Sequence, residues 1–456
     1  MHAPTRFRFA TAWLPEGWKN DVVIGIDDAG NIDSLVAGDR STQALSVAGA
    51  AIPGMPNVHS HAFQRAMAGL AEHRSTAQDS FWTWRETMYA LAGRITPELL
   101  NVIAAQLYVE MLKAGYTTVC EFHYLHRQAQ AAATNEMTMS QAVLDAAAAT
   151  GIGMTLLPTL YQTSGFGGAA PTLRQQQFVC GVDSFVQLID QLQRECVSPQ
   201  AAIGAAIHSL RAVPAAALQD VLRALASRNP AALHIHIAEQ EREVEECVQH
   251  TGRRPIEWLL EHAVIDQRWC LVHATHASSQ ELDAIAGRGA VVALCPTTEA
   301  NLGDGRFALE EFIAAGGAIA IGSDSHISVS AVEELRWLEY QARLRRGQRN
   351  VFASASSDST GAALWRLACA GGAQASGRAV GALQEGRRAD IVVLDLDSPV
   401  LIGRTDDAIM DTFVFAGQPN PVRDVMVGGR WLVQDGHHFA EIPIAAAYRR
   451  ALRALA

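Results

Sequence analysis

The chain has 456 residues, of which 49% are hydrophobic and 18% charged, so it can bury a large core and lacks the composition of a disordered protein. Its formal net charge is −11, and a negative field of that size argues against nucleic acid and anionic membranes as partners. An anionic substrate would need local arginines to overcome this field, and we expect neither a nucleic acid nor a membrane to be bound.

Residues 1–52 are predicted to form short strands and turns. The segment "VVIGIDDAGNIDSLVAG" is typical of a β-hairpin, with Asp28, Ala29, Gly30 and Asn31 as its turn. We interpret this region as the N-terminal part of a small β-sandwich domain.

Residues 53–374 have a different pattern, in which short apolar runs alternate with helical stretches. The runs are nearly continuously apolar, as expected of parallel strands that are buried on both faces. Eight units of one strand and one helix, covering about 300 residues, fit a (β/α)8 barrel. The eight strand candidates, in chain order, are "GAAIPGMPNVH", "YTTVCEFHYLH", "GIGMTLLPTLY", "AAIGAAIHSL", "AALHIHIAE", "RWCLVHATH", "GAVVALCPTTE" and "GAIAIGSDSH".

Helix-start signals occur between these strands. Thr96 precedes Pro97, which is the pattern of an N-cap hydroxyl followed by proline in the first turn, and Gly115 is a natural end for that helix. Ser330 and Glu333 form a capping-box pattern ahead of "LRWLEYQARLRRG".

After residue 375 the strand-and-turn pattern returns. "GRRADIVVLDLD" is followed by "VRDVMVGGRWLVQDG", a predicted hairpin around Gly428 and Gly429. We expect residues 375–456 to complete the β-sandwich domain that the N-terminus begins. The closing segment "AAYRRALRALA" is a basic amphipathic helix to which we assign no chemistry.

The cysteines and the N-terminal sequence indicate the cellular compartment of the protein. The chain has seven cysteines and no Cys-x-x-Cys motif, which favours reduced thiols in a cytoplasmic protein over a disulfide framework. The N-terminus lacks a secretory apolar core, and no stretch of about 18 apolar residues suggests a membrane span. We therefore expect a cytoplasmic protein.

The predicted strand ends carry many histidines and carboxylates, and in parallel barrels the active site forms at this end of the strands. A lone histidine there would most simply be a hydrogen-bonded core residue. Several imidazoles at one mouth would need as many separate partners, whereas one divalent cation satisfies three or four at once. The strand-end residues are His59 and His61; Glu121, His123, Tyr124 and His126; His208 and Arg211; His234, His236 and Glu239; His273 and His276; Asp324 and His326.

A metal site is predicted from the first, fifth and eighth strands. His59 and His61 are two positions apart on a strand, so their rings leave the same face. One imidazole of the fifth strand and Asp324 of the eighth can reach the same axis, and this donor set suits Zn²⁺, with Fe²⁺ as an alternative. Alternation along the strand does not separate His234 from His236, since both face one way.

A single ion is expected, with a separate group for proton transfer. Neither lysine of the chain, Lys19 or Lys113, lies on a strand candidate at the mouth, so a carbamate bridge between two ions is excluded. A carboxylate that does not bind the metal must then carry protons, and Glu239 is our candidate. Its simpler interpretation is a glutamate that stabilises the start of a helix.

The strand-end and insertion residues that remain for a substrate are Gln64, Arg85, Tyr124, His208 and Arg211. Arginine is the natural bidentate partner of a carboxylate, so two arginines at one mouth favour a small anionic dicarboxylate. Arg85 could instead stack on the aromatic residues of "FWTWRE", and Arg211 could form a loop salt bridge. The loop around Phe81 to Trp84 either covers the ligand or packs as a small core.

The motifs "PNVHSH", "HIHIAE", "LVHATH" and "IGSDSH" together resemble the amidohydrolase superfamily. The His-x-x-Glu of the fifth strand resembles its mononuclear deaminase branch. This resemblance implies that His236 rather than His234 binds the metal, together with His59, His61 and Asp324. It also implies that Glu239, His273 and Asp324 are catalytic, and that one Zn²⁺ is bound per chain.

A closer similarity covers nearly the whole chain. "GMPNVHSHAFQRAMAGLAE", "DSFWTWRETMYAL", "EFHYLH", "HSLRAV" and "TTEANLGDGRF" are similar to the deiminases of histidine degradation that convert N-formimino-L-glutamate and water to N-formyl-L-glutamate and ammonia. The resemblance implies this activity, substrate contacts of Gln64, Tyr124 and His208, and a homodimer. The alternatives are a related deaminase acting on a heterocycle or a guanidino or formimino compound, and a metal-binding homologue without activity.

Overall fold

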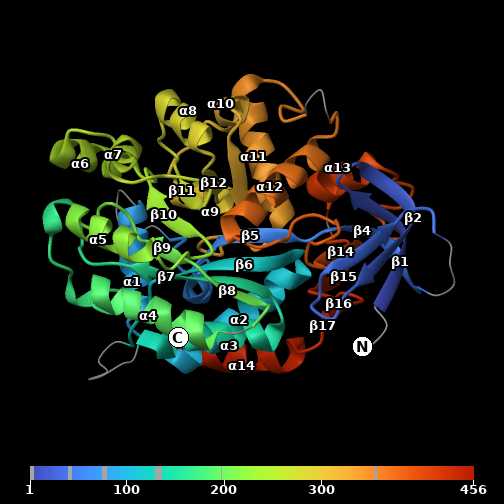
Figure 1. Cartoon of the computed structure of the whole chain (residues 1–456), viewed down its shortest axis with the longest axis horizontal. Coiled ribbons are helices and arrows are strands. Elements are labelled where there is room, and N and C mark those ends of the chain that lie inside the picture. Colours follow the sequence, from blue (N-terminus) through green and yellow to red (C-terminus); the bar gives the residue numbers. More distant parts are fainter. Residues whose placement is uncertain are drawn as a thin grey trace.

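The computed structural model describes residues 5–39, 44–73, 80–128, 136–196, 198–353, 357–417 and 419–455. A parallel barrel surrounded by helices occupies most of the molecule, and a second sheet lies against one side of it (Figure 1). Within the described ranges, no helix has both the length and the apolar character needed to cross a bilayer.

The barrel closes because its last strand pairs with its first. Ile321 is in parallel register with Asn57, and a further bridge joins Ser60 to Asp324. The eight predicted strands are confirmed, with the fourth position filled by two short strands that both pair with the third. The barrel strands are β5 (Met55–Ser60), β6 (Tyr116–His123), β7 (Gly153–Leu160), β8 (Ala201–Ile203) and β9 (Ala205–Ile207), β10 (Leu233–Ile237), β11 (Trp269–His273), β12 (Val291–Leu294) and β13 (Ala318–Ile321).

Two glycines explain where the strands differ from their predicted extents. Gly204 separates β8 from β9, and a Cβ there would lie 2.9 Å from the Ala232 carbonyl oxygen. Gly54 separates β5 from the preceding strand, and a Cβ there would overlap the Thr117 side chain. The first strand candidate is therefore wrong as a single element, because its first half belongs to the flanking sheet.

The flanking sheet is built from both ends of the chain. Its strand order is β17-β16-β15-β14-β4-β1-β2-β3, with β1 and β4 parallel and the other pairs antiparallel. Both predicted hairpins are present, as β2–β3 and as β15–β16. The strands are β1 (Thr5–Leu14), β2 (Gly17–Ile26), β3 (Ile32–Val36), β4 (Leu45–Pro53), β14 (Ile391–Leu394), β15 (Val422–Val427), β16 (Arg430–Gln434) and β17 (His437–His438).

The flanking sheet curls back on itself. Phe7 of β1 meets Trp431 of β16 with ring centroids 5.5 Å apart, although three strands separate β1 from β16 in the sheet. The curl encloses a second hydrophobic core that includes Phe9 and Ile391. The predicted sandwich is thus one continuous sheet. Its boundaries at residues 52 and 374 stay predictions, and the helix α12 (Thr360–Ser376) runs across the second of them.

The predicted helix starts are present. The Thr96 hydroxyl accepts a hydrogen bond from Leu99 N at 3.2 Å, and Gly115, just past the helix end, has φ of 90°. Ser330 caps its helix, whereas the Glu333 carboxylate accepts a hydrogen bond from Ser328 and does not complete the capping box.

Besides α12, the helices of the described residues are α1 (Phe81–Ala92), α2 (Pro97–Lys113), α3 (Glu136–Thr150), α4 (Val182–Glu195), α5 (Ala215–Leu225), α6 (Glu241–Thr251), α7 (Pro255–His262), α8 (Ser279–Arg288), α9 (Pro296–Leu302), α10 (Leu309–Ala314), α11 (Ala331–Arg346), α13 (Asp407–Ala416) and α14 (Glu441–Leu455), with 3-10 turns at Ala62–Met67, Phe166–Gly168 and Leu173–Gln175.

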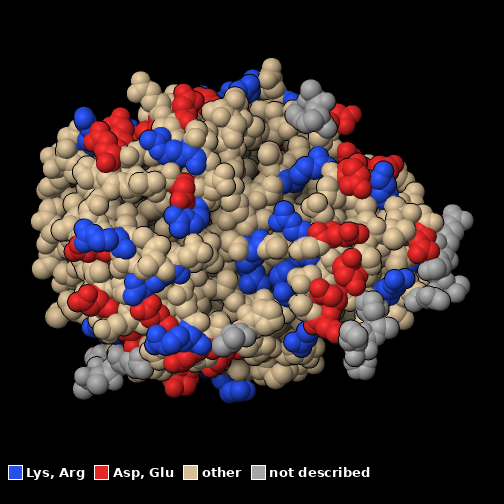
Figure 2. Space-filling view, viewed as in Figure 1, with Lys and Arg blue, Asp and Glu red and all other residues tan. Residues whose placement is uncertain are grey.

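Charge is distributed over the surface without a face of one sign in the view of Figure 2. Acidic and basic side chains alternate there, and basic side chains gather where the barrel meets the flanking sheet. The terminal helix α14 packs along α2, as Figure 1 also shows.

Candidate active site

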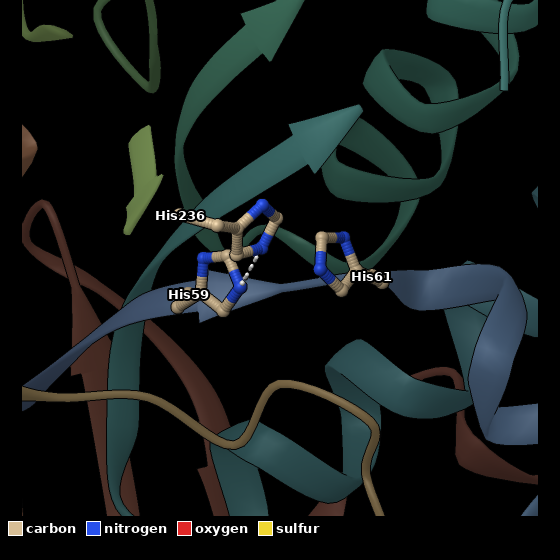
Figure 3. Close-up of side chains that lie close together, drawn as sticks. All are labelled: His59, His61 and His236. Atoms are coloured by element: carbon tan, nitrogen blue, oxygen red, sulfur yellow. Dashed lines mark hydrogen bonds between the residues drawn. The ribbon is translucent and has the colours of Figure 1, made fainter. Parts of the chain in front are cut away.

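Three imidazoles and one carboxylate converge at the carboxyl ends of the barrel strands. His59 Nε2 lies 3.0 Å from His236 Nε2, and Asp324 Oδ1 lies 3.3 Å from Nε2 of both His59 and His61. Figure 3 shows the three rings close together; His59 belongs to β5, His61 directly follows it and His236 belongs to β10. All four residues are buried. Burial, and then the neighbouring histidines, holds the pKa of His59 and His236 well below the usual value, so these rings are neutral.

Backbone carbonyls fix how two of these rings are turned. The Phe122 carbonyl lies 2.9 Å from His61 Nδ1, and the His208 carbonyl lies 2.8 Å from His236 Nδ1. Because a carbonyl only accepts, each Nδ1 carries the proton and each Nε2 presents a lone pair to the cluster. The His236 Nε2 lone pair lies 3.0 Å from His59 Nε2 and needs either a proton from that ring or a cation beside it. The donor set therefore fits a divalent metal ion.

The structure also separates the two histidines of β10. His234 Nε2 bonds to the Ala375 carbonyl at 2.8 Å, so this side chain is used in joining α12 to the barrel. His236, two positions further along the strand, lies in the cluster.

Backbone strain accompanies the cluster. Asp324 has φ of 45° and His273 has φ of 69°, a left-handed conformation that costs a non-glycine residue about 1–2 kcal/mol. Asp324 N donates to the His59 carbonyl at 3.0 Å, and His61 N donates to the Asp324 carbonyl at 3.2 Å. These bonds tie β13 to β5 and hold the carboxylate against both imidazoles.

A second group of ionisable residues borders the cluster. His273 Nε2 lies 3.8 Å from Glu239 Oε1 and 3.9 Å from Asp324 Oδ2. Burial raises the pKa of Glu239 to about 7. Burial alone would lower the pKa of His273, but the carboxylates of Glu239, Glu299 and Asp324 outweigh it and raise that pKa to about 10. The site thus offers a carboxyl group suited to proton exchange near neutral pH beside a cationic donor.

One pocket opens onto both groups, and all five proposed substrate residues line it. Arg85 Nε and Arg211 Nε are buried without a hydrogen-bond partner among the described residues. Buried donors of this kind need an acceptor, and an anionic ligand would supply one. The residues lining the pocket include Gln64, Phe81, Trp84, Arg85, Tyr89, Tyr124, Tyr161, His208, Arg211, His236, Glu239, His273 and Asp324.

The aromatic insertion differs from its prediction. Phe81 to Trp84 form the first turn of helix α1, capped by Ser80, rather than a loop. Phe81 and Trp84 line the pocket, while the Arg85 guanidinium lies 4.4 Å from the centroid of the Trp82 ring. Arg85 therefore stacks on an aromatic ring and also faces the pocket. Its two predicted functions, aromatic stacking and substrate binding, are compatible in this geometry.

Several strand-end histidines lie outside the cluster. His126 Nε2 bonds to the Thr159 carbonyl at 2.7 Å, and His276 Nε2 bonds to the Asp304 carbonyl at 2.9 Å. His123 packs its ring against that of His126. These histidines are hydrogen-bonded or packed side chains of the kind that a lone strand-end histidine usually is.

A buried carboxylate at the end of β6, to which the sequence pattern assigned no function, supports the segment that carries His59 and His61. Glu121 accepts hydrogen bonds from Ser60 Oγ at 2.6 Å, from Ala62 N at 2.7 Å and from the Tyr108 hydroxyl at 3.2 Å. Ser60 stands between His59 and His61, so Glu121 fixes the backbone that presents both rings. Its partners come from separate elements, and no local sequence signal reveals them. Glu299, which lies beside His273, was missed for the same reason.

A parallel barrel whose strand ends gather three imidazoles and a carboxylate defines a metal-dependent hydrolase of the (β/α)8 class. The chain belongs to the amidohydrolase family, whose model matches residues 50–432. It is 48% identical over 442 residues to a protein of Pseudomonas aeruginosa named "Formimidoylglutamate deiminase", which covers 97% of each chain. It is 27% identical over 408 residues to a "5-methylthioadenosine/S-adenosylhomocysteine deaminase" of Natronomonas pharaonis, covering 89% of this chain and 85% of the other.

A solved structure agrees with this membership. The chain is similar to an amidohydrolase from Brucella melitensis, with a TM-score of 0.93, 42% sequence identity and 99% of each chain covered. The flanking sheet therefore belongs to the shared architecture together with the barrel.

Proposed function

We propose that this chain hydrolyses N-formimino-L-glutamate to N-formyl-L-glutamate and ammonia, with one zinc ion held by His59, His61, His236 and Asp324. The observation that carries the proposal is the pocket shared by this cluster and two arginines whose buried Nε groups lack a partner among the described residues. The 48% identity to the named deiminase supports the same substrate.

The arginines are proposed to bind the two carboxylates of the substrate. Guanidinium presents its donors in a planar fork that matches a carboxylate, and buried guanidinium groups favour such a ligand over a neutral ring. We assign the remaining polar contacts to Gln64, Tyr124 and His208, which line the same pocket. The proposed partner is therefore a small anionic dicarboxylate.

The reaction adds water to the formimino carbon and breaks the bond from that carbon to the departing nitrogen. When bound, a divalent cation activates water for attack near neutral pH. Asp324 or Glu239 accepts the proton that the water loses. His273 donates a hydrogen bond that stabilises the tetrahedral intermediate. Glu239 then gives a proton to the departing nitrogen, which leaves as ammonia, and its raised pKa suits both transfers.

One ion is proposed rather than a pair. Lys19 belongs to β2 of the flanking sheet and Lys113 ends α2, so neither supports a carbamate bridge at the mouth. Three imidazoles and one carboxylate favour Zn²⁺, with Fe²⁺ as the alternative. A homodimer and a cytoplasmic location stay predictions, the second from seven cysteines that are all free.

The test is ammonia release from N-formimino-L-glutamate, with guanine, cytosine and 5-methylthioadenosine as competing substrates in separate reactions. We expect turnover of the formimino compound alone. Turnover of a heterocycle instead would favour the related-deaminase alternative. No turnover of any of them, with metal bound, would favour a homologue without activity.

A further inference from the structure

A buried carboxylate stands behind His273, on the side away from the substrate pocket. Glu299 belongs to α9, the short helix that follows β12, and only 4% of its surface is exposed. Its Oε1 lies 3.2 Å from His273 Nδ1, and Glu299 is not among the residues that line the pocket. It therefore reaches the reacting groups only through the imidazole.

The direction of this hydrogen bond follows from a second contact. The backbone N of Cys295 donates to the same Oε1 at 2.9 Å, so this oxygen acts as an acceptor. His273 Nδ1 must then be the donor and carry a proton. The other ring nitrogen, Nε2, is left facing Glu239 and Asp324 at 3.8 and 3.9 Å.

The local fold fixes the positions of both Glu299 and His273. Pro296 starts α9 and Gly303 ends it in a left-handed conformation, which fixes Glu299 in a short rigid helix. His273 itself has φ of 69°, a strained conformation that persists only where surrounding contacts hold it. The bond to Glu299 is one of those contacts and sets the orientation of the ring.

We propose that Glu299 is a positioning residue for the hydrolysis: its carboxylate accepts the hydrogen bond from Nδ1–H of His273 and so aims Nε2–H at the reacting centre. This inference rests on the proposed function for its kinetic consequence, and on geometry alone for the state of the ring. A carboxylate that holds a catalytic imidazole in one orientation is a known source of large rate effects.

A competing explanation is that Glu299 only caps α9 through Cys295 N. Glu334 provides the matched control, because it is also a buried carboxylate that caps α9, accepting from Thr297 N at 2.9 Å. Within the described residues no hydrogen bond or ion pair joins it to His273. If capping were the whole function of Glu299, removing either carboxylate would change kcat and Tm in the same way.

The experiment compares Glu299→Ala, Glu299→Gln and Glu334→Ala with the unaltered holoenzyme, measuring kcat, KM, bound metal and Tm. We expect Glu299→Ala to lower kcat about 10- to 100-fold with KM and metal content unchanged. Glu299→Gln should recover part of the loss, since its amide oxygen still accepts from both donors. Glu334→Ala should lower Tm and leave kcat near normal. Equal kcat losses in Glu299→Ala and Glu334→Ala, or loss of metal in Glu299→Ala, would overturn the proposal.

A readout without substrate separates this inference from the proposed function. In protein with ¹⁵N-labelled histidine, the ¹H and ¹⁵N shifts of the Nδ1–H group of His273 report whether it donates a hydrogen bond to a carboxylate. We expect the downfield proton shift of such a bond in the unaltered protein and its loss in Glu299→Ala. An unchanged spectrum would refute the positioning function even if the enzyme turns over N-formimino-L-glutamate, and the predicted shift would support it even if the substrate proved different.

Discussion

Glu239 has the surroundings of a proton shuttle, with a buried carboxyl group whose pKa is about 7 and an imidazole 3.8 Å away. Replacing it by glutamine keeps the shape and removes the exchangeable proton. We expect Glu239→Gln to lower kcat by about two to four orders of magnitude, with metal retained. Steady-state kinetics and metal analysis of the same sample measure this. Near-normal turnover would reject the shuttle.

The two arginines of the pocket test the substrate class. Arg85→Ala should raise KM about 10- to 100-fold, the value of a charged hydrogen bond of about 1.5–3 kcal/mol. Arg211→Ala should raise KM and also lower kcat, because its guanidinium lies 3.9 Å from Glu239. Both effects are read from initial rates over a range of substrate concentrations.

Arg242 is the matched control for these variants. It stacks on Trp82 at 4.5 Å and pairs with Glu246 at 2.7 Å, yet it does not line the pocket. Arg242→Ala should leave KM unchanged. An unchanged KM in Arg85→Ala and Arg211→Ala as well would mean that the substrate carries no carboxylate at this position.

The chemistry of the strand-end side chains predicted which histidines and carboxylates gather at the site. The structure was needed to show which of them has which function. Alternation along β10 could not distinguish His234 from His236, because both side chains leave the same face of the strand. The structure distinguishes them by depth, since one reaches the Ala375 carbonyl and the other reaches His59. Glu299 was not predicted, because its partner His273 lies 26 residues earlier and on another element.

At the scale of elements, the terminal helix α14 is joined to α2 by an ion pair. Glu441 Oε2 lies 2.7 Å from Lys113 Nζ and Glu441 Oε1 lies 2.7 Å from His437 Nδ1. The hydrogen bonds from Lys113 and then His437 lower the pKa of Glu441 to about 2. The amphipathic pattern of the sequence predicted this helix, but such a pattern cannot show which helix it packs against.

This pair predicts a pH-dependent contribution to stability. A carboxyl group whose pKa falls on folding stabilises the protein above its unfolded value of about 4.3, and the contribution is lost as the pH falls toward 2. Because the pair is partly exposed, we expect Glu441→Gln to cost about 0.5–1 kcal/mol between pH 7 and about pH 5, and progressively less below that. Urea unfolding of the variant and the parent between pH 7 and pH 3 measures the difference. A difference that grows toward pH 3 would contradict the assigned pair, and Glu195→Gln at the exposed end of α4 is the control.

The continuous apolar runs predicted where the strands lie, but they did not predict the breaks at Gly54 and Gly204. An apolar run shows that a segment is buried but not which sheet it belongs to. The run that contains β4 and β5 was therefore predicted as one strand, although Gly54 divides it between two sheets. The fourth strand was likewise predicted as one piece, because the break at Gly204 depends on the backbone of Ala232 in the neighbouring segment.

At the scale of the whole molecule, the fold was predictable because both kinds of pattern are long and repeated. Eight apolar runs at strand spacing specify a closed barrel, and two β-rich ends specify a flanking domain. The curl of that domain was not predictable, because it depends on a contact such as Phe7 with Trp431, which are far apart in sequence.

Removal of the metal should affect the whole molecule as well as the reaction. The cluster joins β5, β10 and β13, so an ion that binds only the folded state stabilises it by about 4 kcal/mol at a concentration 1,000 times its Kd. We expect a chelator to abolish activity and lower Tm, and added Zn²⁺ to restore both. A chelated protein with unchanged Tm and activity would contradict a metal centre.

We propose that one ion is held by His59, His61, His236 and Asp324. An anomalous difference map from crystals of the purified protein, collected on both sides of the zinc absorption edge, tests this proposal most directly. We predict one peak per chain, about 2.0–2.2 Å from the Nε2 atoms of the three histidines and from the Asp324 carboxylate. A fully occupied peak at another place, or none within reach of these four side chains in protein that retains activity, would contradict it.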